Sequence, residues 1–311
     1  MKFLKSFVIL IAGSSFLNAQ STVSTPIVGF ENKGVNAGTT AMGVGFVKPA
    51  VFSGSASSVS TTVISVSTGS FGNFAPANSL PTHYVLLTSG AMVGFVLDIL
   101  ANTTSSITVD ADLTSILGTT PQFKIIPHTK LSDVFSGNAS LSDYVDTVTV
   151  YHSNGNPLTL LRDSSATTGW VDGASFAEAD SVIYPGQGFL LATSGNASVT
   201  TSGQVRSDTV KVPLYAAGVN LVSASNPGAN PDIQSINLGQ DMADFVDTFG
   251  TFSVDGLNNQ NANYLWGGIA DGFISPDTFA PITNVTVQGT SAILVNVSSD
   301  LNWNLPPPVS P

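Results

Sequence analysis

Three histidines, His83, His128 and His152, are the side chains that could activate a hydrolytic nucleophile. A serine hydrolase needs such a base beside its serine and an orienting acid, and many hydrolases place the serine in a Gly-x-Ser-x-Gly turn. The chain contains no turn of that sequence. His128 comes at an expected helix start, where a hydrogen bond to the backbone is the main expectation. His152 precedes a polar turn and is expected in a solvated loop.

Two pairs of aspartates could supply the carboxylates that a glycosidase needs on either side of a sugar bond. The pairs are Asp143 with Asp146 and Asp244 with Asp247. Both pairs lie in turn-rich acidic segments, where aspartates commonly accept hydrogen bonds from nearby backbone. We therefore expect surface or capping acids, and a polysaccharide hydrolase or lyase remains an alternative.

Metal binding is expected to be limited to calcium, because calcium prefers oxygen ligands. Scattered histidines and the absence of cysteine make zinc improbable. The best candidate ligands are Asp110, Asp112 and Asp255, although neither segment matches the EF-hand pattern. Ordinary Asx turns are the alternative reading of these residues. No cofactor is expected apart from a structural calcium ion.

Three large aromatic residues could stack on sugar rings if they are exposed. Tyr264 and Trp266 are the most suggestive, because Gly267 and Gly268 follow them and would let a ring stand clear. Trp170 is the third candidate. Burial in a core is the alternative, and large aromatic side chains are commonly buried.

The composition excludes several classes of protein. The 311 residues carry a net charge of −11, with 9 Lys and Arg against 20 Asp and Glu, so a nucleic-acid partner is not expected. Hydrophobic residues make up 42% of the chain, which is enough for a packed core. Charged residues make up 9%, and Glu31 and Glu178 are the only glutamates, which disfavours helical bundles and coiled coils.

The first nineteen residues have the order of a secretory signal peptide. Lys2 and Lys5 precede an apolar run, residues 7–12, and Ala19 provides a small residue at the expected cleavage point. The run is too short to cross a bilayer, which takes about 20 residues. We expect export to the periplasm, the cell surface or the medium, with no transmembrane segment in the mature chain.

Alternating apolar residues bounded by Gly, Asn and Ser predict an all-β fold, with sandwich or barrel-like domains. The clearest stretch predicts a three-stranded meander over residues 84–88, 93–100 and 107–110. Short helical turns are expected over residues 127–135 and 231–238, with Thr129 as a possible cap of the first.

Similar segments recur about a hundred residues apart. Residues 143–147 read DYVDT and residues 244–248 read DFVDT, while residues 186–191 (GQGFLL) compare with residues 289–294 (GTSAIL). The pattern predicts an internal duplication, with the two copies packed as paired halves. Chance resemblance in a biased composition is the alternative.

Seven segments occur in a familiar order. They are residues 123–131, 134–135, 146–151, 169–170, 182–191, 201–206 and 218–223. In order and spacing they resemble an uncharacterised paralogous family of exported proteins, best known from verrucomicrobial bacteria. The resemblance implies export and a β-rich fold, and it implies no activity and no catalytic residues.

These observations predict an acidic, exported bacterial protein built from several β domains. The expected segments are a signal peptide (1–19), an N-terminal β domain (20–122), two β-rich repeats (123–206 and 207–305) and a proline-rich tail (306–311). The expected role is non-catalytic, as a cell-surface or extracellular structural or adhesive component. Its expected partners are further copies of itself or an extracellular polysaccharide. A carbohydrate-binding module is the main alternative.

Overall fold

The computed structural model describes residues 26–69, 71–136, 140–152, 157–228, 230–253, 256–283 and 285–308. Within these ranges nearly all regular structure is β, which confirms the predicted fold class. The described helical structure is one short helix, α1 (Leu131–Val134), and one 3₁₀ turn, η1 (Thr114–Ile116). No helix in the described ranges is long and apolar enough to span a membrane.

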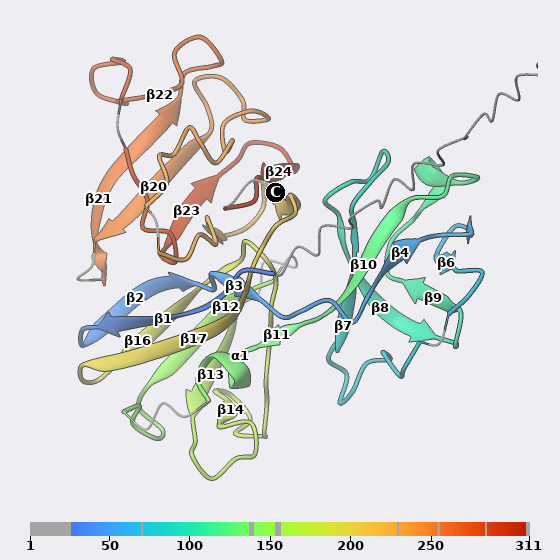
Figure 1. Cartoon of the computed structure of the whole chain (residues 1–311). Helices are drawn as coiled ribbons and strands as arrows, with labels where there is room; N and C mark the ends of the chain where they lie inside the picture. Colours follow the sequence, from blue (N-terminus) through green and yellow to red (C-terminus); the bar gives the residue numbers. More distant parts are fainter. Residues whose placement is uncertain are drawn as a thin grey trace, which may run out of the picture.

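Seven strands form a curled sheet, seen on the right of Figure 1. In spatial order they are β4 (Phe52–Ser55), β10 (Gln122–Pro127), β7 (His83–Leu87), β8 (Val96–Asn102), β9 (Ser106–Val109), β6 (Val63–Ser65) and β5 (Ser58–Val59). Alternate side chains, such as Val85, Ile107 and Phe123, pack into one core on the inner side. The predicted meander over residues 84–110 is confirmed as β7, β8 and β9.

A second unit, here called the first sandwich, lies at the lower left of Figure 1. Its main sheet has the order β14 (Trp170–Asp172), β13 (Pro157–Arg162), β12 (Thr147–Tyr151), β16 (Gly188–Thr193) and β2 (Gly38–Gly43). The facing strands are β1 (Val28–Val35), β17 (Ala197–Val205) and β3 (Phe46–Val47), and a small pair is formed by β11 (Thr129–Lys130) and β15 (Val182–Ile183). Helix α1 closes the core.

The first sandwich is built from strands that precede the curled sheet in the sequence and from strands that follow it. Residues 28–47, which the sequence analysis grouped with the N-terminal β domain, pair with β16 and β17 through β1, β2 and β3. The curled sheet is therefore inserted into the first sandwich between β3 and β11. Such long-range pairing is set by tertiary packing and leaves no local signal in the sequence.

The third unit, the second sandwich, lies at the upper left of Figure 1. Its main sheet has the order β22 (Phe273–Ile274), β21 (Gly256–Trp266), β20 (Thr248–Ser253), β23 (Ala292–Asn296) and β19 (Asn220–Ser223), and β18 (Val210–Leu214) pairs with β24 (Leu301–Leu305). Each of these strands occupies the place of a strand in the first sandwich. The two main sheets thus have the same strand order and antiparallel pairing.

The two sandwiches meet through reciprocal contacts. The N–H of Gly43 in β2 donates to the carbonyl of Thr290 at 2.8 Å, and the N–H of Ser223 in β19 donates to the carbonyl of Gly186 at 2.9 Å. Gly43 and Ser223 occupy equivalent positions in the two units, and so do Gly186 and Thr290. Each unit therefore donates the same bond to the other, as in a two-fold interface. A Cβ added to Gly43 would lie 2.2 Å from the Cβ of Ser223, so only glycine allows the two strands to approach this closely.

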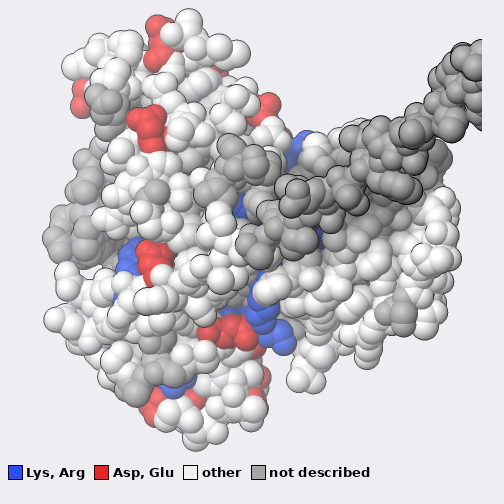
Figure 2. All heavy atoms as spheres, viewed as in Figure 1, with Lys and Arg blue, Asp and Glu red and all other residues white. Residues whose placement is uncertain are grey.

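The curled sheet is fixed to the second sandwich as well as to the first. Tyr84, Leu86 and Ile126 on its outer face belong to the same buried cluster as Val210 and Val212 of β18. Alongside this cluster, the Lys124 ammonium lies 2.7 Å from the Asp208 carboxylate. On the face shown in Figure 2, charged side chains are sparse, in keeping with the low charged content of the chain.

The two expected helical turns differ from the prediction in detail. The first is the four-residue helix α1, which starts after Lys130, and the Asp133 carboxylate accepts the Lys130 N–H at 2.9 Å. Thr129 lies in strand β11 and does not cap the helix. The second segment is a series of turns, in which Asp232 accepts the N–H of Gln234 at 2.8 Å.

Candidate functional site

A cavity of about 290 Å³ lies where the curled sheet and the two sandwiches meet. We call it the junction cavity. The curled sheet contributes carboxylates, the first sandwich contributes aromatic residues from the ends of β12 and β15, and the second sandwich contributes β18 and β19. The polar and aromatic residues that line it are Asp98, Asp110, Tyr151, His152, Tyr184, Gln187, Lys211, Tyr215 and Asn220.

Asp98 on β8 is the centre of the polar contacts at one wall of the cavity. Its Oδ2 accepts the Tyr184 hydroxyl at 2.6 Å, and its Oδ1 lies 2.9 Å from Nε2 of His128. His128 is fully buried between the rings of Tyr84 and Tyr184. These contacts join the curled sheet to the first sandwich at the point where the cavity opens.

Two side-chain amides, of the half-buried Gln187 and the buried Asn220, hold the backbone of the three cavity tyrosines. The Gln187 side chain accepts the N–H of Tyr184 at 3.0 Å and donates to the carbonyl of Tyr151 at 2.8 Å. The Asn220 side chain bonds both the N–H and the carbonyl of Tyr215, at 2.8 and 2.9 Å. Both amides are thus occupied within the fold. The tyrosines are held on a rigid frame, as a preformed binding site requires.

The charge state of the cavity follows from burial and from Asp98. Burial, followed by the charge of Asp98 and the hydrogen bond to it, raises the pKa of Tyr184, which remains a hydrogen-bond donor at neutral pH. Burial and then the charge of Asp98 raise the pKa of the Asp110 carboxyl. Burial lowers the pKa of His152, which favours the neutral imidazole. Lys211 is engaged elsewhere, with Nζ 4.7 Å from the centroid of the Phe95 ring.

The aromatic residues predicted to bind sugars lie mainly inside the hydrophobic cores of the two sandwiches. Trp170 is fully buried against Phe135. Trp266 is 8% exposed and covers Gly239, and Tyr264 stacks on Phe249 with ring centroids 4.7 Å apart. The structure therefore places the two tryptophans in the core, and their role in binding remains a prediction.

The edge of Trp266 does reach a surface hollow. Residues including Gln234, Asn237 and Asp271 surround this hollow, which has a volume of about 230 Å³. It is the point at which a ligand could touch the aromatic group that the sequence analysis selected.

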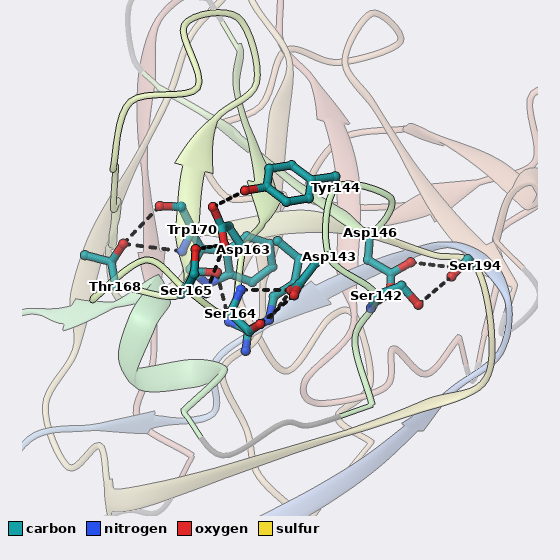
Figure 3. A network of polar contacts seen from close by, with 12 residues as sticks. Ser142, Asp143, Tyr144, Asp146, Asp163, Ser164, Ser165, Thr168, Trp170 and Ser194 are labelled. Atoms are coloured by element: carbon teal, nitrogen blue, oxygen red, sulfur yellow. Dashed lines mark hydrogen bonds and ion pairs between the residues drawn. The ribbon is translucent and has the colours of Figure 1, made fainter.

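The aspartate pairs have structural partners. Figure 3 shows Asp146 between Ser142 and Ser194, whose backbone N–H groups donate to it at 2.8 and 2.7 Å. Asp247 accepts the N–H groups of Ala243 and Ser298, both at 2.8 Å. Asp146 and Asp247 are each 1% exposed, and both cap backbone N–H groups, as one of the sequence-based alternatives predicts.

The candidate calcium ligands do not converge in the described residues. Asp110 accepts the N–H of Asp98 at 2.9 Å, and Asp112 accepts the N–H of Thr114 at 2.8 Å in an Asx turn. Asp255 lies outside the described residues. Among those that are described, no group of three or more His, Asp or Glu side chains could hold a metal ion.

Sequence reasoning did not find the junction cavity, because its residues come from four separated segments. Asp98, Asp110, Tyr184 and Tyr215 have no common spacing in the sequence. Asp110 and His152 were singled out separately, as a calcium ligand and as a possible base, and nothing in the sequence joined them. His128, beside the cavity, bonds the Asp98 carboxylate with its side chain instead of the expected backbone. Only the docking of the curled sheet brings these groups together.

Comparisons with models of protein families, with curated proteins and with solved structures find no match for this chain.

Proposed function

We propose that this protein is an exported, non-catalytic adhesive component that binds a sugar residue of an extracellular polysaccharide in the junction cavity. The observation that carries this proposal is the set of three tyrosines fixed around the Asp98 and Asp110 carboxylates. Aromatic faces pack against the apolar face of a sugar ring, and carboxylates accept its hydroxyl groups. The volume of the cavity, about 290 Å³, suits a single small ligand.

Export is part of the proposal and rests on the sequence of residues 1–19. The expected location is the periplasm, the cell surface or the medium. A low density of charge on the face in Figure 2 is compatible with a neutral glycan partner and gives no basic surface for nucleic acid.

The direct test is isothermal titration of the mature chain, residues 20–311, with glucose, galactose, mannose, N-acetylglucosamine and glucuronate. Binding of at least one sugar is expected. Tyr215→Ala should weaken it about tenfold or more, which is about 1.4 kcal/mol, because the ring is partly exposed in the cavity. Tyr264→Ala is the matched control, since Tyr264 lies outside the cavity.

The outcomes separate the proposed site from the alternatives. Loss of binding in Tyr264→Ala but not in Tyr215→Ala would move the site from the cavity to the aromatic pair of Tyr264 and Trp266. Turnover of a polysaccharide that disappears in Asp110→Asn would replace the non-catalytic role with that of a hydrolase or lyase. No heat from any of the five sugars would refute sugar binding in the cavity.

A structural role through self-assembly is a second candidate function, favoured by strand β1. This strand is at the edge of its sheet, and Val28 and Phe30 are 72% and 77% exposed. An exposed apolar edge strand can pair with the same strand of a second copy. Light scattering on protein washed gently from cells should then give a large regular mass that falls in Phe30→Lys, whereas a monomer in both would exclude this role.

We further infer that the two sandwiches arose by duplication of one unit, and that the curled sheet was inserted into the first copy. The equal strand order of the two main sheets and the equivalent capping by Asp146 and Asp247 support this inference. The duplicated unit would then begin near β1 rather than at residue 123. A pair of similar units also provides two equivalent surfaces on one chain.

A further inference from the structure

The DYVDT and DFVDT segments form the same turn in the two sandwiches. Tyr144 and Phe245 both have φ of 58°, in the left-handed region. The Tyr144 N–H donates to the carbonyl of Arg162 at 2.8 Å, and the Phe245 N–H donates to the carbonyl of Trp266 at 2.6 Å. The buried aspartate that ends each turn is explained by its backbone contacts, but the aromatic residue is not.

Both aromatic side chains are unfavourable for the fold at these positions. A bulky residue is rare in the left-handed region, where glycine or asparagine is tolerated. Tyr144 is 56% exposed and Phe245 is 55% exposed, so neither ring recovers the cost by packing in a core. Residues held in such backbone conformations are often functional.

A second pair of equivalent positions repeats the pattern. Phe176 has φ of 57° and Phe279 has φ of 56°. Each N–H donates to the carbonyl four residues earlier, that of Asp172 and that of Ser275, both at 2.8 Å. Both rings are also mostly exposed. Each sandwich therefore presents two exposed aromatic rings on rigid turns.

Tyr144 shows how such a ring is held. Figure 3 shows its hydroxyl turned towards Asp163, whose Oδ2 accepts it at 2.6 Å. Asp163 is itself fixed by the N–H and hydroxyl of Ser165, at 2.9 and 2.6 Å. These bonds lower the pKa of Asp163, and the bond to Asp163 raises the pKa of Tyr144, so the pair is charge-assisted near neutral pH.

We propose that Tyr144 and Phe245, assisted by Phe176 and Phe279, are stacking platforms for the pyranose rings of a polysaccharide, separate from the junction cavity. The Tyr144 ring is anchored at both ends, and the three phenylalanine rings are placed by their backbone turns, so each is presented at little entropic cost, as a platform for a sugar ring requires. Polar groups beside Tyr144, including Asp143 and Ser164, can meet the hydroxyl groups of the sugar. The choice of ligand class rests on the proposed function.

A polymer long enough to reach both sandwiches would contact two platforms of one chain. Binding at one sandwich raises the local concentration of the same polysaccharide at the other, so retention exceeds that of either platform alone. Soluble monosaccharides gain nothing from this effect. The platforms should therefore matter for retention on insoluble polymer and not for the titration of the cavity.

The experiment measures retention of the mature chain on cellulose, chitin and insoluble xylan. Retention on at least one polymer is expected. Tyr144→Asn and Phe245→Asn remove the rings while keeping a residue that tolerates the left-handed region, so both variants should fold. Each should weaken retention about tenfold, and the double variant about a hundredfold. Ile269→Ala removes an exposed apolar side chain elsewhere and is the control.

A second variant separates stacking from the hydrogen bond. Tyr144→Phe keeps the ring and should lose much less retention than Tyr144→Asn. Tyr215→Ala should weaken monosaccharide binding but keep the retention that the platforms supply, so a failure of the cavity and a failure of the platforms give different results. Unchanged retention in the double variant, equal loss in Ile269→Ala, or no retention of the parent chain on any of the three polymers would each overturn the proposal.

Discussion

The buried carboxylates of Asp146 and Asp247 allow the equivalence of the two sandwiches to be measured as a free energy. Each side chain accepts two backbone N–H groups at 2.7 to 2.8 Å and is 1% exposed. Replacement by alanine removes the charged acceptor of both N–H groups. A hydrogen bond to a charged group contributes about 1.5–3 kcal/mol, so two of them give about 3–6 kcal/mol. We expect a loss of about 4 kcal/mol in the free energy of unfolding for either variant.

Urea denaturation followed by tryptophan fluorescence measures this loss. With a slope of about 2–3 kcal/mol per molar urea, a loss of about 4 kcal/mol lowers the midpoint by more than about 1 M. Hydrogen exchange then shows which unit is affected, because Asp146→Ala should expose amides of β12 and Asp247→Ala those of β20. Local exchange is needed because a chain of several units need not unfold in one step.

Asp241→Asn is the control, because Asp241 is exposed and accepts a hydrogen bond from the Asn304 side chain at a long 3.4 Å. It should change the free energy of unfolding by less than about 0.5 kcal/mol. A loss below about 1 kcal/mol in either alanine variant would show that the backbone N–H groups find other partners. A loss in only one of the two would show that the turns are equivalent in geometry but not in energy.

Three further predictions concern the contacts between units. Gly188→Ala should cost about 2–3 kcal/mol in thermal or urea unfolding, because the new Cβ would lie 2.4 Å from that of Ala292, whereas Gly195→Ala, with open space around it, should be nearly neutral. Tyr184→Phe should cost about 1.5–3 kcal/mol, because the largely buried carboxylate of Asp98 loses one of its two side-chain partners and keeps His128. Asp110→Asn should raise the urea midpoint at pH 7. A carboxyl with a raised pKa stabilises the fold while it is protonated and loses that contribution as pH rises through its folded pKa, whereas asparagine stays neutral. The difference between the variant and the parent chain should vanish below about pH 4, where the carboxyl is protonated in both states.

The sequence predicted what depends on neighbouring residues. Alternation over residues 84–110 identified three strands, because each strand buries one face and the turns between them are short. The matching DYVDT and DFVDT segments identified the two equivalent turns. Helix α1 was predicted to within a few residues. Its first turn is closed by the Asp133 carboxylate, which accepts the Lys130 N–H, and not by Thr129.

The sequence did not predict what depends on distant pairing. Strand β1 pairs with β17, and nothing in residues 28–35 indicates a partner that far along the chain. The burial of Trp170 follows from the packing of α1 over the main sheet, and local sequence does not show it. For the same reason the tyrosines of the junction cavity were not grouped, since their positions are set by the docking of three separate units.

The inserted curled sheet explains why the two sandwiches, so alike in topology, differ in their sites. On the second sandwich it covers β18 through Tyr84, Leu86 and Ile126, and its strand β8 brings Asp98 to the open end of β15. The reciprocal place, between β1 and the Thr290 loop, receives no strand of the curled sheet. There the Lys33 ammonium bonds the Ser291 hydroxyl at 2.8 Å. The insertion therefore turns one of two equivalent grooves into an aromatic cavity. The curled sheet does not cover the exposed turns, which keep the same form in both sandwiches.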